Sequence, residues 1–206
     1  MWCITCSARR VCGLVLAKLV SNGACLCQRR ARSQRHVRGT CGHWTSSSIV
    51  TFRAKPFKIC NVIDEFTREH VGFEVARSIT ATAVIDLLEN VAAVRGRPRV
   101  LRMDNGPEFI SHELTGWAGK HDTVEAFIPP GMPWHNGFVE SFHNRLRDEL
   151  LEDEIFDDPA HASRCLRLWS KRYNTYHPHS SLGFIPPTEY ANQWHQTQEG
   201  TQTARS

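Results

Sequence analysis

The stretch Pro98-Arg-Val-Leu-Arg-Met-Asp-Asn-Gly-Pro107 decides the fold class, because it predicts a buried strand that ends in a polar turn. Residues 98–103 have the length and apolar content of a short strand, and the Asn-Gly-Pro sequence that follows breaks it. Asp104 therefore lies at the carboxyl end of a strand, where ligands gather in sheets that helices cover. An aspartate that stood there alone would most often cap its own turn.

Two strands and a helix are predicted upstream of this stretch. Residues 57–63 and 71–75 are short apolar runs, and the polar segment 64–68 separates them. A helix follows, with apolar residues at helical spacing over 83–91, Thr80 as its N-cap and Gly96 as its stop.

More strands and helices are predicted downstream. They comprise an amphipathic segment at 108–117, a strand at 124–128, a helix at 137–151 and a last long helix opened by Asp158 and Pro159. The proline-rich residues 129–134 form a stiff loop between them. Strands that give way to alternating strands and helices predict an α/β fold, with a mixed sheet flanked by helices.

Charge divides the chain near residue 64. No Asp or Glu precedes Asp64, whereas 11 of the 25 Lys and Arg residues do, so residues 64–206 carry a net charge of −7. This excludes a uniformly basic DNA-binding module. No apolar run reaches the roughly eighteen residues that span a bilayer, which excludes a transmembrane channel or enzyme.

Cysteine divides the chain in the same way, with six of the eight cysteines before residue 42. Three interpretations of residues 1–55 stay open. Arg9-Arg10 and the apolar run after them imitate the signal peptide of a secreted disulfide protein. The Cys3-x-x-Cys6 pair and later Cys and His residues could hold zinc. The third interpretation is an irregular basic extension that binds polyanions without specificity. It does not require the second Cys pair that a zinc site would need and that is not found at matching spacing.

A second acid pairs with Asp104 in the sequence pattern. Glu140 follows it with 35 residues between them, in the first turns of the helix predicted at 137–151. Glu140, Asn144 and Arg147 share one face of that helix, beside the apolar stripe Val139, Phe142, Leu146 and Leu150. Carboxylates can hold Mg²⁺, and two such ions about 4 Å apart can activate a hydroxyl for attack on a phosphodiester. The alternative for Glu140 and Arg147 is a solvated helix face.

The chain resembles the bacterial insertion-sequence transposases whose second reading frame encodes a DDE integrase core with a ribonuclease-H-like fold. The resemblance rests on motifs that follow the family's order: Asn61-Val-Ile-Asp-Glu-Phe-Thr-Arg68, Arg102-Met-Asp-Asn-Gly-Pro-Glu-Phe-Ile110, Pro129-Pro-Gly-Met-Pro-Trp-His-Asn-Gly137, Val139-Glu-Ser-Phe-His-Asn-Arg-Leu-Arg147, Tyr173-Asn174, His177-Pro-His-Ser-Ser-Leu-Gly183 and Pro187-Thr-Glu-Tyr-Ala191. It implies a core domain at 56–191, preceded by an irregular Cys- and Arg-rich extension at 1–55 and followed by a polar tail at 192–206.

By this resemblance Asp104 and Glu140 are the second and third catalytic carboxylates, and they hold Mg²⁺ or Mn²⁺. The implied DNA-binding residues are Asn105, Trp134, His135, Asn136, Asn144 and Arg147. His177 and His179 are expected to be positioning residues and not ligands.

The first catalytic aspartate of the family is missing. The resemblance places it on the opening strand, near residue 44, where this chain has no acid. Asp64, the first acid of the chain, matches a position that is not catalytic in the family. Codons for Cys41–Ser48 can be chosen so that another frame reads Trp-Ala-Leu-Asp-Phe-Gln-Phe, the family's first-strand motif. We therefore hypothesise that the residues up to about Phe52 are translated out of frame.

The resemblance implies a protein of DNA transposition and integration that, when intact, cuts DNA at element ends and joins the 3′ hydroxyl to target DNA. This copy is predicted to be inactive without its first aspartate. The alternative is a non-catalytic remnant that binds DNA or oligomerises and so modulates active transposase. Expected partners are element-end and target DNA and other transposase subunits, with no membrane, in the bacterial cytoplasm at the nucleoid. DNA would bind local basic patches drawn from Arg95, Arg97, Arg99, Arg102, Arg145, Arg147, Lys171 and Arg172.

Overall fold

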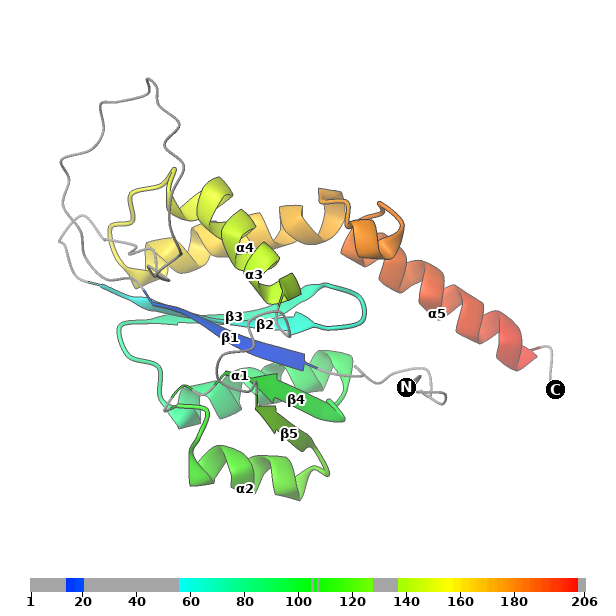
Figure 1. Cartoon of the computed structure of the whole chain (residues 1–206), viewed down its shortest axis with the longest axis horizontal. Coiled ribbons are helices and arrows are strands. Elements are labelled where there is room, and N and C mark those ends of the chain that lie inside the picture. Colours follow the sequence, from blue (N-terminus) through cyan, green and yellow to red (C-terminus); the bar gives the residue numbers. More distant parts are fainter. Residues whose placement is uncertain (1–13, 21–55, 105, 107, 128–136, 204–206) are drawn as a thin grey trace, which may run out of the picture.

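The computed structural model describes residues 14–20, 56–104, 106, 108–127 and 137–203. A five-stranded sheet in the order β3-β2-β1-β4-β5 lies at its centre, with helices on both faces (Figure 1). The strands are β1 Leu14–Val20, β2 Lys58–Asp64, β3 His70–Ala76, β4 Val100–Met103 and β5 Val124–Phe127. β1 pairs antiparallel with β2 and parallel with β4. The predicted mixed sheet flanked by helices is therefore confirmed.

The helices form two layers around the sheet (Figure 1). They are α1 Ala81–Arg95 and α2 His112–Lys120 on one face, and α3 Gly137–Leu146 and α4 Pro159–Tyr176 on the other. A π-helical segment, Arg147–Leu151, continues α3, and α5 Pro187–Thr203 extends away from the body next to α4. No helix among the described residues is both long and apolar enough to cross a membrane.

β2 shows how one strand serves both layers. Ile59 and Ile63 belong to the core beneath α3 and α4, whereas Cys60 and Val62 belong to the core beneath α1 and α2. Alternate side chains of a strand point to opposite faces, so a strand covered on both faces is apolar along its length. Between the two ends of β2, which are Lys58 and Asp64, Asn61 is the exception, since it is polar and fully buried.

Local signals in the sequence place two helix starts correctly. The Thr80 side chain accepts a hydrogen bond from the Ala83 amide at 3.3 Å, and α1 ends at Gly96 with a φ of 86°. The Asp158 carboxylate accepts one from the His161 amide at 2.7 Å, directly before Pro159. Both helices are thus capped as predicted.

Two elements differ from the predictions. Leu14–Val20 forms the central strand, whereas the sequence predicts an irregular extension over the first 55 residues; the apolar run fits a position between two strands. No helix was predicted after residue 187, whereas α5 runs from Pro187 to Thr203 and includes most of the polar tail expected at 192–206. Phe66 of the β2–β3 turn packs against Tyr190 and Trp194 of α5, with ring centroids 5.5 and 5.6 Å away, and this contact fixes a helix that is mostly polar.

Close packing between β3 and α1 depends on a glycine. A Cβ atom added at Gly72 would lie 2.7 Å from Cγ2 of Val91 and 3.2 Å from Cδ1 of Leu87. Only a residue without a side chain fits at this distance. Gly72 therefore sets how closely α1 approaches the sheet.

Candidate active site

Asp104 directly follows β4 and its side chain caps the turn there. The carboxylate oxygen Oδ1 accepts a hydrogen bond from the Gly106 amide at 2.8 Å. A Cβ atom at Gly106 would lie 2.9 Å from the same oxygen, so a glycine lets the turn close on the carboxylate. The turn-capping role and the candidate metal role thus fall on one side chain, which is half-buried. Asn105 lies outside the described residues.

Glu140 lies in the first turn of α3 and is half-buried. The apolar stripe predicted for this helix is confirmed, because Val139, Phe142, Leu146 and Leu150 are all buried. α3 contacts β1, the strand next to β4, so the helix that carries Glu140 covers the centre of the sheet.

The predicted polar face of α3 is formed in part. Arg147 Nη1 donates to Asn144 Oδ1 at 3.1 Å, which brings these two side chains together. The Nε atom of Arg147 is buried and has no hydrogen-bond partner among the described residues. Trp134, His135 and Asn136 lie outside the described residues.

The strand beside Asp104 supplies no acid. Met103 pairs with Leu16, so one further step of the same parallel register places Asp104 beside Ala17. β1 reads Leu-Val-Leu-Ala-Lys-Leu-Val, without a carboxylate. The region near residue 44, where the resemblance expects the first aspartate, lies outside the described residues.

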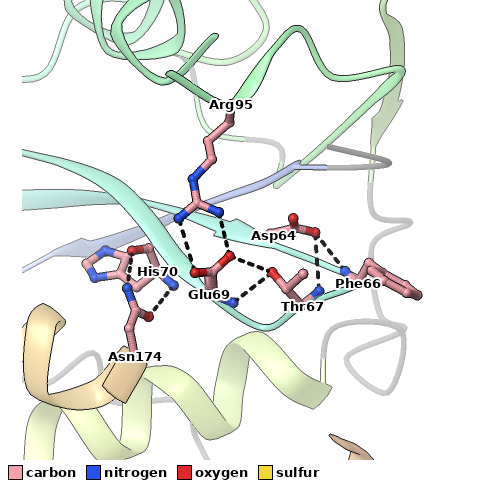
Figure 2. Close-up of polar contacts among 7 residues, drawn as sticks. All are labelled: Asp64, Phe66, Thr67, Glu69, His70, Arg95 and Asn174. Atoms are coloured by element: carbon pink, nitrogen blue, oxygen red, sulfur yellow. Dashed lines mark hydrogen bonds and ion pairs between the residues drawn. The ribbon is translucent and has the colours of Figure 1, made fainter. Parts of the chain in front are cut away.

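Asp64 occupies a different part of the sheet. It pairs with Leu14, three residues from Ala17 along β1, which corresponds to about 10 Å, and it lies a further strand away from β4. Its carboxylate Oδ1 accepts a hydrogen bond from the Phe66 amide at 2.8 Å within the β2–β3 turn (Figure 2). Burial raises the pKa of this carboxyl. Asp64 therefore holds the turn and is too far from Asp104 to share a metal ion with it.

The donor groups do not fit a complete metal site. In the part of the chain that the structure describes, no group of three or more His, Cys, Asp or Glu side chains could hold an ion. Asp104 and Glu140 are left as a candidate pair of carboxylates without the third ligand that the resemblance implies.

A polar pair that the sequence reasoning missed, formed by the buried Asn61 and the half-buried His143, lies beneath α3. Asn61 of β2 approaches His143 of α3, with 3.4 Å between Nδ2 and Nε2. Burial, followed by the nearby charge of Arg147, lowers the pKa of His143 to about 4. Asn61 also pairs with Ala17 through the backbone, so this contact joins the helix of Glu140 to the strands beside Asp104. The sequence signal for this contact is Asn61 itself, a polar residue in the middle of an otherwise apolar strand.

A second polar cluster fixes the β2–β3 turn between α1 and α4 (Figure 2). Glu69, which is 3% exposed, accepts two hydrogen bonds from Arg95 of α1, at 2.5 and 3.1 Å. Asn174 of α4 accepts from the His70 amide at 2.9 Å and donates to the His70 carbonyl at 3.0 Å. These residues therefore position elements and do not reach the candidate site.

The C-terminal motif also serves to hold elements together. Arg145 Nη1 lies 2.6 Å from His177 Nδ1, and the other ring nitrogen of His177 lies 2.9 Å from Glu149. Glu149 accepts a further hydrogen bond from the Trp169 indole at 2.9 Å. His177 thus joins the end of α4 to the α3 region.

Several arginines that could have offered DNA a basic patch are paired with carboxylates. The pairs are Arg95 with Glu69, Arg97 with Glu89 at 3.2 Å, Arg102 with Glu65 at 2.8 Å and Arg172 with Glu149 at 3.4 Å. Because the acid neutralises the guanidinium, these positions attract phosphate less than their sequence pattern predicted.

The chain matches known protein families over most of its length. One model described as "Integrase core domain" matches residues 40–133 and a second of the same description matches residues 123–187. The chain is 41% identical over 138 residues to an uncharacterized protein of insertion element IS476 from Xanthomonas euvesicatoria, covering 67% of this chain and 40% of that protein. It is 37% identical over 134 residues to a protein of insertion element IS407 from Burkholderia multivorans, covering 65% of this chain and 48% of that protein.

A named transposase and two solved structures are also similar. The transposase InsF of insertion sequence IS3A from Escherichia coli is 25% identical over 134 residues, covering 64% of this chain and 46% of InsF. The magnesium complex of the HTLV-2 integrase catalytic core superposes with a TM-score of 0.58 at 12% identity, covering 88% of this chain and 96% of that one. The catalytic core of BIV integrase gives 0.56 at 16% identity, covering 94% and 99%. These structures share the fold, and the chain spans less than half the length of the IS476 protein, the IS407 protein and InsF.

Proposed function

Because this chain belongs to the integrase core domain family of insertion-element transposases, we propose that it is a DNA transposition protein that binds DNA without cleaving or joining it. The observation that supports the proposal is the sequence of the central strand β1, which pairs with β4 as far as Met103 and contains no carboxylate. Loss of one ligand weakens metal binding and suppresses the phosphoryl transfer that depends on it. The proposed DNA partners are the element ends and the target.

The residue roles follow from the family and from the placement of α3. Asp104 and Glu140 are proposed as the two surviving carboxylates for a divalent ion, Mg²⁺ or Mn²⁺. Arg147 and Asn144 are proposed to contact DNA, since a guanidinium close to the candidate metal site and held by Asn144 can donate to a phosphate oxygen. Asn105, Trp134, His135 and Asn136 are proposed to contact DNA from the neighbouring segments.

The test measures binding and cleavage separately. The purified full chain is titrated with a labelled duplex that carries an element end, and then incubated with supercoiled plasmid and Mg²⁺ or Mn²⁺. We expect binding of the duplex, and nicking no faster than that of the Asp104→Asn, Glu140→Gln double variant. Nicking that the double variant abolishes would show that the chain is an active nuclease. A chain that binds no DNA at low salt would overturn the DNA-binding function.

A second candidate function is interference with active transposase. The observation that favours it is the retention of both cores of the fold in a chain whose central strand lacks the acid. Added to a transposition reaction of an active relative, the chain is expected to lower the yield in proportion to its amount. An unchanged yield at a tenfold molar excess would exclude this function.

We further infer that the residues up to about Phe52 are read out of frame in this gene. Resequencing across the codons for Arg30 to Lys58 tests this directly. A frame that encodes Trp-Ala-Leu-Asp-Phe joined to Pro56 would identify a broken copy of a three-carboxylate enzyme. If no frame supplies the aspartate, the N-terminal segment is genuine and the interference function gains weight.

A further inference from the structure

The exposed face of α4 carries a row of cations. α4 contains four Lys and Arg residues and no Asp or Glu over its 18 residues. Ala162, Leu166, Trp169 and Tyr173 are buried against the sheet, so the opposite side of the helix faces away from it. Arg164, Arg167 and Lys171 are exposed there, and we name these three residues the cationic face of α4.

The cationic face differs from four other basic positions, which form ion pairs with carboxylates. They are Arg95, Arg97, Arg102 and Arg172. Within the described residues, no ion pair involves the three members of the cationic face. Arg164 helps to lower the pKa of the Asp158 carboxyl, although that carboxylate already accepts the capping hydrogen bond from the His161 amide, which is the larger cause.

We propose that the cationic face of α4 is a second DNA-backbone surface, separate from the candidate active site. The inference rests on the proposed function, since it takes DNA as the partner. The charge pattern supports this partner, because residues 64–206 carry a net charge of −7 and this helix is a local exception. Arginine also suits phosphate, to which its planar guanidinium donates two parallel hydrogen bonds.

The dimensions of the face suit a duplex. Arg164 and Lys171 lie seven residues apart, which corresponds to about 10 Å along a helix. Successive phosphates of one DNA strand advance by about 3.4 Å along the duplex axis, so the three cations can engage up to three phosphates. Because the face is directed away from the sheet, the DNA held here is not the segment at Asp104. It is flanking or target DNA bound without sequence preference.

A second copy of this chain is the competing occupant. Residues 148–158 contain seven Asp and Glu residues and no Lys or Arg, so the acidic segment of one copy could face α4 of another. DNA is the better fit, because three exposed cations in a row along one side of a helix match a linear polyanion. The experiment below separates the two occupants.

The test compares two triple variants with the same change in net charge. In Arg164→Gln, Arg167→Gln, Lys171→Gln the cationic face is neutral. In the control, Arg77→Gln, Arg97→Gln, Lys120→Gln, three exposed cations outside α4 are neutral. Affinity for a 30-base-pair duplex of random sequence is measured by fluorescence anisotropy from about 50 to 200 mM salt. Each lost phosphate contact should reduce the slope of log K against log salt by about 0.9.

We expect the slope to fall by about 2 to 3 in the α4 variant and by less than 1 in the control. If both triple variants behave alike while the unmodified chain binds DNA, the α4 surface is wrong and the proposed function stands. If the unmodified chain binds no DNA, both fail. A change in sedimentation of the α4 variant without DNA, with an unchanged slope, would assign the face to a second copy. If the triple variant does not fold, each single substitution should still lower the slope by about 0.9, and three unchanged slopes would overturn the surface.

Discussion

Asn174 of α4 and His70 of β3 are 104 positions apart in sequence, yet the Asn174 amide group satisfies both backbone groups of His70. His70 is 3% exposed, and its ring packs among those of Phe73, Phe142 and Trp169. At the residue scale, the buried polar side chains of this protein mostly fix one element against another. Such long-range pairs leave no local pattern, so the sequence could not predict them.

The buried histidines predict that stability rises with pH in weak acid. Burial lowers the pKa of His70 to about 3 and that of His143 to about 4, whereas both are near 6.5 in the unfolded chain. Between about pH 4 and 6 the unfolded chain therefore binds more protons than the folded one. Stability should fall by up to about 1.4 kcal/mol per histidine for each unit of acidification in that range. Urea unfolding from pH 4 to pH 8 measures it.

The His70→Phe variant isolates one of these contributions. The variant keeps an aromatic ring of similar size. At pH 8 the residue at position 70 is uncharged in both proteins, so their difference in unfolding free energy there measures packing alone. Below pH 6 the variant should lose stability less steeply than the unmodified chain. Parallel curves for the two proteins would show that His70 does not titrate as its burial implies.

The ion pair of Glu69 and Arg95 predicts a large coupling between the two residues. Arg95→Met leaves the carboxylate of Glu69, which is 3% exposed, without its partner. We expect a loss of about 2 to 3 kcal/mol, less than for a fully buried pair because Arg95 is 35% exposed. Adding Glu69→Gln removes the unpaired charge and should recover at least half of the loss. Chemical unfolding of the unmodified chain, the two single variants and the double variant gives the coupling energy. If the effects of the two substitutions simply add, the residues are not coupled.

At the element scale, the helices that carry clear local signals were predicted well and the others were not. Thr80 and Asp158 cap α1 and α4 as expected. The helix expected at 108–117 begins later, at His112, because the amides of Phe109 and Ile110 bond to the Gly106 carbonyl and Ser111 caps the helix. α5 was missed because its sequence is polar and its aromatic contacts to Phe66 are tertiary.

Gly72 gives a prediction for the packing of α1 on the sheet. Gly72→Ala places a methyl group 2.7 Å from Cγ2 of Val91, a stiff β-branched side chain, so α1 must shift. We expect a loss of about 1 to 3 kcal/mol. The double variant Gly72→Ala, Val91→Ala removes the clash and should be more stable than the sum of its single variants. Thermal unfolding tests this, and simple additivity would show that the contact is not tight.

At the scale of the whole molecule, the sequence predicted the fold class and the family. It did not predict which strand lies next to Asp104 in the candidate site. Asp104 and Glu140 were singled out by their places at a strand end and on a helix and by the resemblance to the family, and they stay predictions as metal ligands. The strand beside Asp104 could not be found, since Leu14–Val20 lies far from β4 in the sequence and has no motif. Sheet order is set by contacts between distant segments, which one sequence does not display.

The register predicts that one substitution would restore a metal site. Ala17→Asp adds a carboxylate at the position beside Asp104 and should raise Mn²⁺ affinity at least tenfold over the matched variant Ala17→Asn. Asp104→Asn should remove the gain. Titration calorimetry, on variants shown to be folded by circular dichroism, measures both. Equal Mn²⁺ affinity of the Ala17→Asp and Ala17→Asn variants would contradict the register.

The position of β1 also shapes how the chain folds during synthesis. β1 leaves the ribosome before the other described strands, yet one of its two neighbours, β4, begins only at Val100. At about 5 to 20 residues per second, the nascent chain waits several seconds with one side of an apolar strand unpaired. An open edge of this kind recruits other chains, and contacts so distant along the sequence form slowly. We therefore expect slower translation before Val100 to lower the yield of folded protein, and added chaperone to restore it.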